Sequence, residues 1–229
     1  ARLHDFAITE KEAERERNVV LQEHDWRVGS SPYRRFERRL DRELIPDHPS
    51  GQWTIGTRES IGALTLAEAQ AFHRAWYAVN NAYFVVKADM SVEELRAIAD
   101  RTLGKLRAKR LPPRATLKQP AVPIERKDFS ESDRAVKRAS VLYRKLIRIE
   151  GGDTAAQRAA RSILAGFLRS RLPGSPHDVL VDRQEVANGT PLVGIDRVAP
   201  KTFVVRMSAE VAPDVDTEKL RTAMETYVD

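Results

Sequence analysis

Two glutamates spaced at a helical interval are the first feature of this sequence that could do chemistry. The segment EAERERNVVLQE, residues 12–23, places Glu16 and Glu23 seven positions apart. In a helix, that separation turns the side-chain direction by only about 20° and advances it by about 10 Å, so both carboxylates share one face. A carboxylate on such a face can be aimed at a fixed point. The same pattern also fits a solvated helix in which Glu23 pairs with Arg27 at i,i+4.

Few other side chains offer metal ligands or nucleophiles. The chain has five histidines and no cysteine, which excludes disulfides, thiolate metal sites and a cysteine nucleophile. His24 follows Glu23, but neighbours on a helix point about 100° apart, so we expect a surface histidine. His48 lies in the run DHPSGQW, which is typical of a turn. Ser170 has no His/Asp arrangement around it in the sequence, which argues against a serine nucleophile.

Five segments with helical periodicity alternate with β-rich runs. Four of the helices begin with a Ser or Thr followed three residues later by Glu or Gln, which is the capping-box pattern. The expected helix starts are Thr9, Thr65, Ser91, Thr154 and a position near Asp216, and the first helix is expected to end at about Arg27. The expected strands are residues 82–88, 135–149, 192–198 and 202–211.

This order of elements predicts an α+β fold with two similar domains of mixed helices and mostly antiparallel sheet. Residues 108–123, AKRLPPRATLKQPAVP, contain four prolines and several basic residues without a sustained period, which indicates a linker. We therefore expect a first domain over residues 1–107, a linker over 108–123 and a second domain over 124–229. The first domain is expected to be incomplete.

Charge and hydropathy narrow the classes of partner. The chain has 39 basic and 33 acidic residues, a formal net charge of +6, and these charges are interspersed. A solvated surface explains such a pattern, and no zinc finger, RNP-like aromatic motif or GxxG loop supports nucleic-acid binding. The basic run of residues 134–148 alternates with apolar residues, as in strands with one face in solvent, and leaves substrate or partner contact open. No apolar run approaches the roughly 18 residues of a membrane span.

Five motifs in sequence order resemble the pitrilysin/insulinase family of zinc metallopeptidases, which includes mitochondrial processing peptidase. Each motif is modest alone, but their shared order covers most of the chain. Tyr77 and Asn80 stand at the positions of the family's Tyr-x-x-Asn turn. The motifs are ERNVVLQE at residues 16–23, His48-Pro49, TIGTRESI at 54–61, LTLAEAQAFHRAWYAVNNAYFVVKAD at 64–89 and FLRSRL at 167–172.

The resemblance implies a metal site that this chain holds only in part. In the family, zinc is bound by the two histidines of an inverted HxxEH motif and by a downstream glutamate, which corresponds to Glu23. The resemblance makes Glu16 an outer carboxylate that supports the metal ligands. No HxxEH is present, so its histidines and its general-base glutamate are expected upstream of Ala1. Tyr77 and Asn80 are expected to have a substrate-binding or structural role.

The implied function is therefore peptide-bond hydrolysis by a zinc-dependent endopeptidase of which this chain is a fragment, inactive and without bound zinc on its own. The expected partners are a peptide or unfolded protein substrate and a second homologous half or subunit, with no nucleic acid and no membrane span. A non-catalytic homologue that serves as a binding or partner subunit is the alternative. The resemblance points to a bacterial protein of the periplasm or cytoplasm, and the sequence leaves the compartment open.

Overall fold

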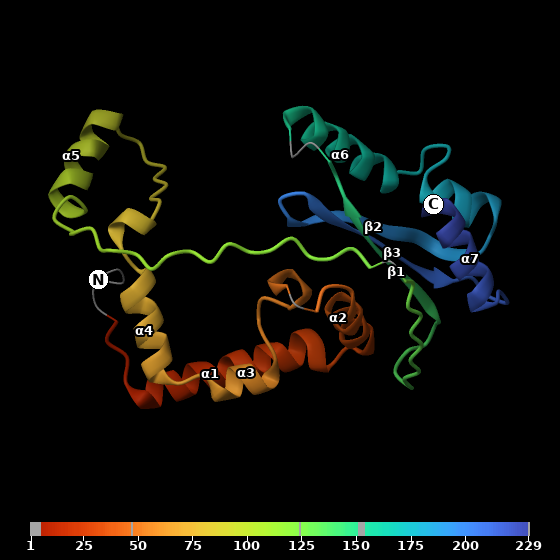
Figure 1. The fold of residues 1–229 in the computed structure, drawn as a ribbon, viewed down its shortest axis with the longest axis horizontal. Helices are drawn as coiled ribbons and strands as arrows, with labels where there is room; N and C mark the ends of the chain where they lie inside the picture. Colours follow the sequence, from red (N-terminus) through yellow and green to blue (C-terminus); the bar gives the residue numbers. More distant parts are fainter. Residues whose placement is uncertain (1–5, 47, 124, 151–153, 229) are drawn as a thin grey trace. The chain divides into compact units, whose positions relative to one another are not determined.

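The computed structural model describes residues 6–46, 48–123, 125–150 and 154–228, which form an α+β chain (Figure 1). The chain divides into two compact units. Unit 1 combines Ala1–His24 with Ile55–Thr116, and unit 2 combines Asp25–Thr54 with Leu117–Asp229. The expected domain limits differ from these units in the placement of residues 25–54, and they stay a prediction.

Unit 1 is built from helices. They are α1 (Glu10–His24), α3 (Arg58–Ala63), α4 (Leu66–Trp76), the 3-10 turn η3 (Val79–Asn81) and α5 (Val92–Thr102). The expected capping boxes are present at α4 and α5, where Thr65 pairs with Glu68 and Ser91 with Glu94. The Arg17 guanidinium donates to the Leu64 carbonyl at 2.8 Å, which fastens α1 to the chain after α3.

The expected strand at residues 82–88 does not form. The segment AYFVVKA follows η3 without regular secondary structure. Tyr83 is 99% exposed and Val85 96% exposed. A strand forms only when a neighbour satisfies its main-chain groups, and the described part of unit 1 contains no such neighbour. The β-propensity of the sequence was therefore insufficient.

Unit 2 contains a three-stranded antiparallel sheet in the order β1-β3-β2. Its strands are β1 (Ser140–Arg148), β2 (Ala187–Ala199) and β3 (Thr202–Val211). They confirm three of the expected strands, with shifted ends for β1 and β2 and with the expected limits for β3. The other elements of unit 2 are the π turn η1 (Asp25–Gly29), α2 (Pro32–Leu44), the 3-10 turn η2 (Pro49–Gly51), α6 (Ala155–Leu168), the π turn η4 (Asp178–Arg183) and α7 (Thr217–Val228).

The two faces of this sheet pack against different elements. On one face, Val193 and Met207 lie in a buried cluster with Leu180 of η4 and with Leu220 and Met224 of α7. On the other face, Leu146 and Val204 pack against Ile45, directly after α2. Side chains alternate between faces along a strand, so the register Arg144–Arg206–Gly194 across the three strands belongs to the face on which α2 packs.

Candidate functional site

Glu16 and Glu23 lie on the same helix, α1, as the sequence predicts. Glu16 is exposed, and its carboxylate contacts the Arg15 guanidinium at 3.2 Å. Glu23 is half-buried near the C-terminal end of the helix. The helix therefore presents both carboxylates, but the metal-binding role of Glu23 and the supporting role of Glu16 stay predictions.

Among the described residues, Glu23 belongs to no cluster that could hold a metal ion. Within residues 6–46, 48–123, 125–150 and 154–228, no group of three His, Asp or Glu side chains is arranged to hold a metal ion. His24, the last residue of α1, is buried, which corrects the expectation of a surface histidine. His48 is also buried, and its Nδ1 accepts the Ser50 N–H at 3.1 Å, which supports its expected role in a turn.

Tyr77 and Asn80 lie in a turn that holds the following connector. The Asn80 side chain both donates to the Lys109 carbonyl at 3.0 Å and accepts the Lys109 N–H at 3.1 Å. The Tyr77 carbonyl accepts from Lys109 Nζ at 3.2 Å, and the Tyr77 ring stacks on His73 with centroids 4.5 Å apart. Asn81 adds a bond to Arg114 at 2.9 Å. These contacts are structural in kind; a role in substrate binding stays a prediction.

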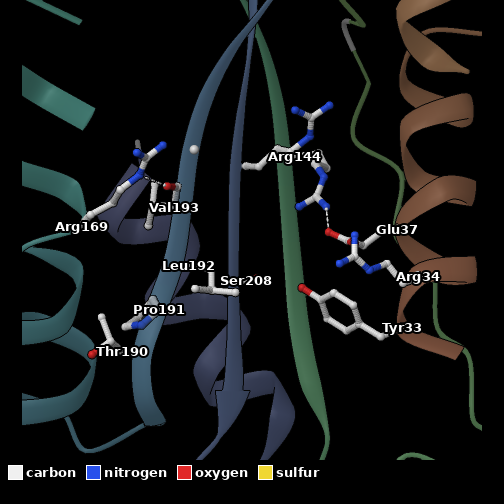
Figure 2. Close-up of a pocket in the computed structure, with 12 residues that line it drawn as sticks. Tyr33, Arg34, Glu37, Arg144, Arg169, Thr190, Pro191, Leu192, Val193 and Ser208 are labelled. Carbon is white, nitrogen blue, oxygen red and sulfur yellow. Dashed lines mark hydrogen bonds and ion pairs between the residues drawn. The ribbon is translucent and has the colours of Figure 1, made fainter. Parts of the chain in front are cut away.

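A cavity of about 550 Å³ lies in unit 2, between α2 and the sheet face that carries Arg144 (Figure 2). We call it the arginine groove. Its floor includes Arg206 and Gly194, which has no side chain to fill the space. Side chains from α2 line one wall, and the end of α6 and the start of β2 supply the opposite rim. These lining residues are Tyr33, Arg34 and Glu37 on the first side and Arg169, Thr190 and Pro191 on the second.

An ionic network centred on the buried Arg144 fixes the floor of the arginine groove. The Arg144 side chain is only 6% exposed and contacts Glu37 at 2.9 Å and Asp41 at 3.4 Å. Asp41 also contacts Arg206 at 3.5 Å, and Arg206 pairs with Asp196. Each charge of this network therefore has an opposite charge beside it, as a desolvated ion needs.

The arginines on the two rims of the groove differ from those of the floor in having no ion pair with the described residues. Arg34 of α2 is exposed, and its guanidinium makes no hydrogen bond or ion pair with the described residues. Arg169 caps the end of α6, and its Nε donates to the Val193 carbonyl at 3.0 Å (Figure 2). No carboxylate of the described residues pairs with it. Burial raises the pKa of Tyr33, and its hydroxyl has a side-chain hydrogen bond with Ser208 on the floor of the groove.

Comparison with known proteins identifies the family. A family model described as the peptidase M16 inactive domain matches residues 63–175. The chain belongs to the M16, or pitrilysin, family. No curated protein matches the sequence.

Solved structures agree with the fold of this M16 chain. A protease from Helicobacter pylori is 21% identical over 96% of this chain and 52% of its own, with a TM-score of 0.78. A peptidase M16 inactive domain from Pseudomonas fluorescens is 20% identical over 99% and 53%, with a TM-score of 0.71. Pitrilysin is 20% identical over 99% and 24%, with a TM-score of 0.65. The M16 chain thus spans about half the length of the first two structures and a quarter of the third.

Sequence reasoning missed the arginine groove because it missed α2. Ser31 caps this helix by accepting the Arg34 N–H, and Pro32 occupies its first position. The Ser-Pro start of this helix was therefore visible in the sequence. The capping-box pattern requires Glu or Gln at the third helical residue, which here is Arg34, so that pattern did not identify α2. The basic run of residues 134–148 was noted, yet its Arg144 acquires its partners from α2, more than 100 positions earlier in the chain.

Across the parts of the chain that the structure describes, no helix is long and apolar enough to cross a membrane.

Proposed function

We propose that this M16 chain works as part of a zinc-dependent endopeptidase, to which it contributes Glu23 as a metal ligand and a surface for peptides. The observation that carries this proposal is the family match together with the placement of Glu16 and Glu23 on one helix. The HxxEH histidines and the general base come from other sequence, on the same polypeptide or on a partner subunit.

The donor set of this chain does not by itself fit a catalytic zinc. Such a site uses three protein ligands, and the described residues contain no group of three that could hold a metal. In the assembled enzyme, bound zinc would polarise the substrate carbonyl and lower the pKa of a water molecule. The part proposed for this chain is limited to Glu23, which binds, and Glu16, which orients the ligands. The chain alone is therefore expected to be inactive.

The test assembles this chain, or a variant of it, with a family segment that carries HxxEH. Zinc content and peptidase activity of each assembled enzyme are then compared. Glu23→Gln should remove stoichiometric zinc and activity together, because one of the three protein ligands of the zinc is lost. Glu16→Gln should weaken zinc binding by about 10- to 100-fold, as outer partners of metal ligands do. Glu10→Gln, at the start of the same helix, is the control and should retain both properties. Full zinc and activity in the Glu23 variant would remove Glu23 from the site.

A second candidate function is a non-catalytic M16 subunit that binds peptides or a catalytic partner. The description of the matching family model as the inactive domain favours it. If the assembled enzyme keeps its activity and zinc when Glu23 is replaced, but loses activity when this chain is omitted, the non-catalytic function is supported. The expected partner in either case is a second homologous half or subunit, and the expected substrate is a peptide or an unfolded protein.

A further inference from the structure

We propose that the arginine groove binds carboxylate groups of acidic peptides, with Arg34 and Arg169 as the two side chains that hold the anion. The inference rests on the proposed function in one respect, namely that the ligands of this chain are peptides. It concerns unit 2 alone and requires neither zinc nor Glu23.

The charges of the groove are complementary to an anion. Its four arginines face three carboxylates, Glu37, Asp41 and Asp196, and those three already pair with Arg144 and Arg206. The guanidiniums of Arg34 and Arg169 stay without a carboxylate partner among the described residues, on opposite sides of the cavity (Figure 2). Guanidinium groups form short, charge-assisted hydrogen bonds with carboxylates, often in pairs.

The floor prepares the site by holding its shape. Arg144 is buried and bonded to Glu37 and Asp41, so α2 and the sheet keep a fixed spacing under the cavity. Gly194 leaves the floor open beside Arg206. A ligand therefore meets a preformed concave surface and needs to order only the exposed side chains of Arg34 and Arg169, which lowers the entropy lost on binding.

The alternative mode, addition of a peptide strand to the edge of β2, is disfavoured at this place. The Val193 carbonyl points away from β3 and already accepts from Arg169. Pro191 lies in the bulged stretch between Asn188 and Leu192 and has no N–H to donate to an added strand. Main-chain pairing is therefore blocked along this stretch, and recognition falls to the ligand's acidic groups.

The test is a fluorescence-anisotropy titration of the whole chain with three labelled peptides. The first is a glutamate-rich peptide with an amidated C-terminus, the second replaces glutamate by glutamine, and the third is the glutamine peptide with a free C-terminal carboxylate. The first should bind, with an affinity that falls as salt rises, and the second should not. Binding of the third would show that the groove accepts a terminal carboxylate, and absence of its binding would assign the site to side-chain carboxylates.

Variants connect this binding to the groove. Arg34→Gln and Arg169→Gln should each weaken binding of the glutamate peptide by about tenfold or more, since each removes a charged hydrogen-bond donor. Lys219→Gln removes the same charge from α7, which packs on the other face of the sheet, and should bind as the unaltered chain does. Arg34 has no partner to lose, so its variant should keep the thermal midpoint even if Arg169→Gln does not.

Equal binding of the glutamate and glutamine peptides would overturn the proposal, and so would an Arg34→Gln variant that binds like Lys219→Gln. Because the titration needs no zinc, failure of the metal test leaves this result standing. Conversely, a chain that fails to bind the glutamate peptide would leave the proposed role of Glu23 unaffected.

Discussion

Arg144 illustrates how a single side chain decides the character of a site. It is a strand residue in a basic run that reads as a solvated surface, yet its guanidinium lies 2.9 Å from Glu37 and is nearly enclosed. Arg138 stands in the same basic run, and its contact with Glu210 at 3.5 Å is largely exposed. The two arginines differ in burial, and this difference sets the energy of each pair.

Replacing Arg144 by Met should destabilise the chain by about 3 kcal/mol, because Glu37 then keeps a largely buried charge without its guanidinium and Asp41 keeps only its contact with Arg206. Arg138→Met should change the free energy of unfolding by less than about 1 kcal/mol, as expected for an exposed pair. Urea unfolding followed by circular dichroism measures both. Similar losses for the two variants would mean that burial of the Arg144 network is not what stabilises it.

At the scale of elements, the helices of unit 1 depend on their first turns. Glu94 accepts hydrogen bonds from the Ser91 N–H and hydroxyl, both at 2.8 Å. These bonds, with the backbone N–H as the larger cause, lower the pKa of Glu94 from 4.5. Capping bonds also lower the pKa of Glu12, where the Thr9 backbone bond is the larger cause, and of Glu68, where the Thr65 side-chain bond is.

The sign of this shift predicts how helix content depends on pH. A carboxyl whose pKa is lower in the folded state stabilises the fold above its unfolded pKa, and this stabilisation is lost as pH falls through the folded pKa. Far-UV circular dichroism should therefore stay constant down to about pH 4.5 and decrease below it. Glu94→Gln should lessen the decrease, because its amide oxygen still accepts but does not titrate, whereas Glu93→Gln leaves the capping bonds in place. An unchanged titration in Glu94→Gln would contradict this account.

The connector after α5 is held by Asn80 through a pair of hydrogen bonds to the main chain of Lys109. Asn80→Ala should release it and cost about 1 to 2 kcal/mol in local stability, at about 1 kcal/mol for each bond. Cleavage by trypsin after Lys109 and Arg110 should become faster in native conditions. Asn188→Ala, which removes one exposed bond to Glu210, is the control and should leave that cleavage rate unchanged.

At the scale of the whole molecule, the connector of residues 108–123 is bonded on both sides of a short exposed stretch. Arg114 bonds to Asn81 in unit 1, and Gln119 accepts from the Thr202 hydroxyl in unit 2. Residues 115–118 between these points are exposed and without regular secondary structure. Limited proteolysis by trypsin should therefore cut first after Arg114 or Lys118. First cuts inside α5 or α6 would show that the connector is not the most accessible segment.

Sequence alone determined the features that depend on neighbouring residues. The starts of α4, α5 and α6 follow from a Ser or Thr and an acceptor three positions on, since the capping bonds close within one turn. Strand β3 was found with the limits 202–211, because its apolar and β-branched residues identify it without reference to a partner. The family was also recognisable from the order of short motifs.

Only the tertiary structure decided the features that need a distant partner. Residues 82–88 have the composition of a strand and stay unpaired, since pairing depends on a second strand that local sequence does not specify. The arginine groove joins α2, all three strands of the sheet and the end of α6, and in the sequence its charged residues resemble ordinary surface residues. Burial and pairing turn such charges into a site, and both depend on which segments the fold brings together across more than 100 positions.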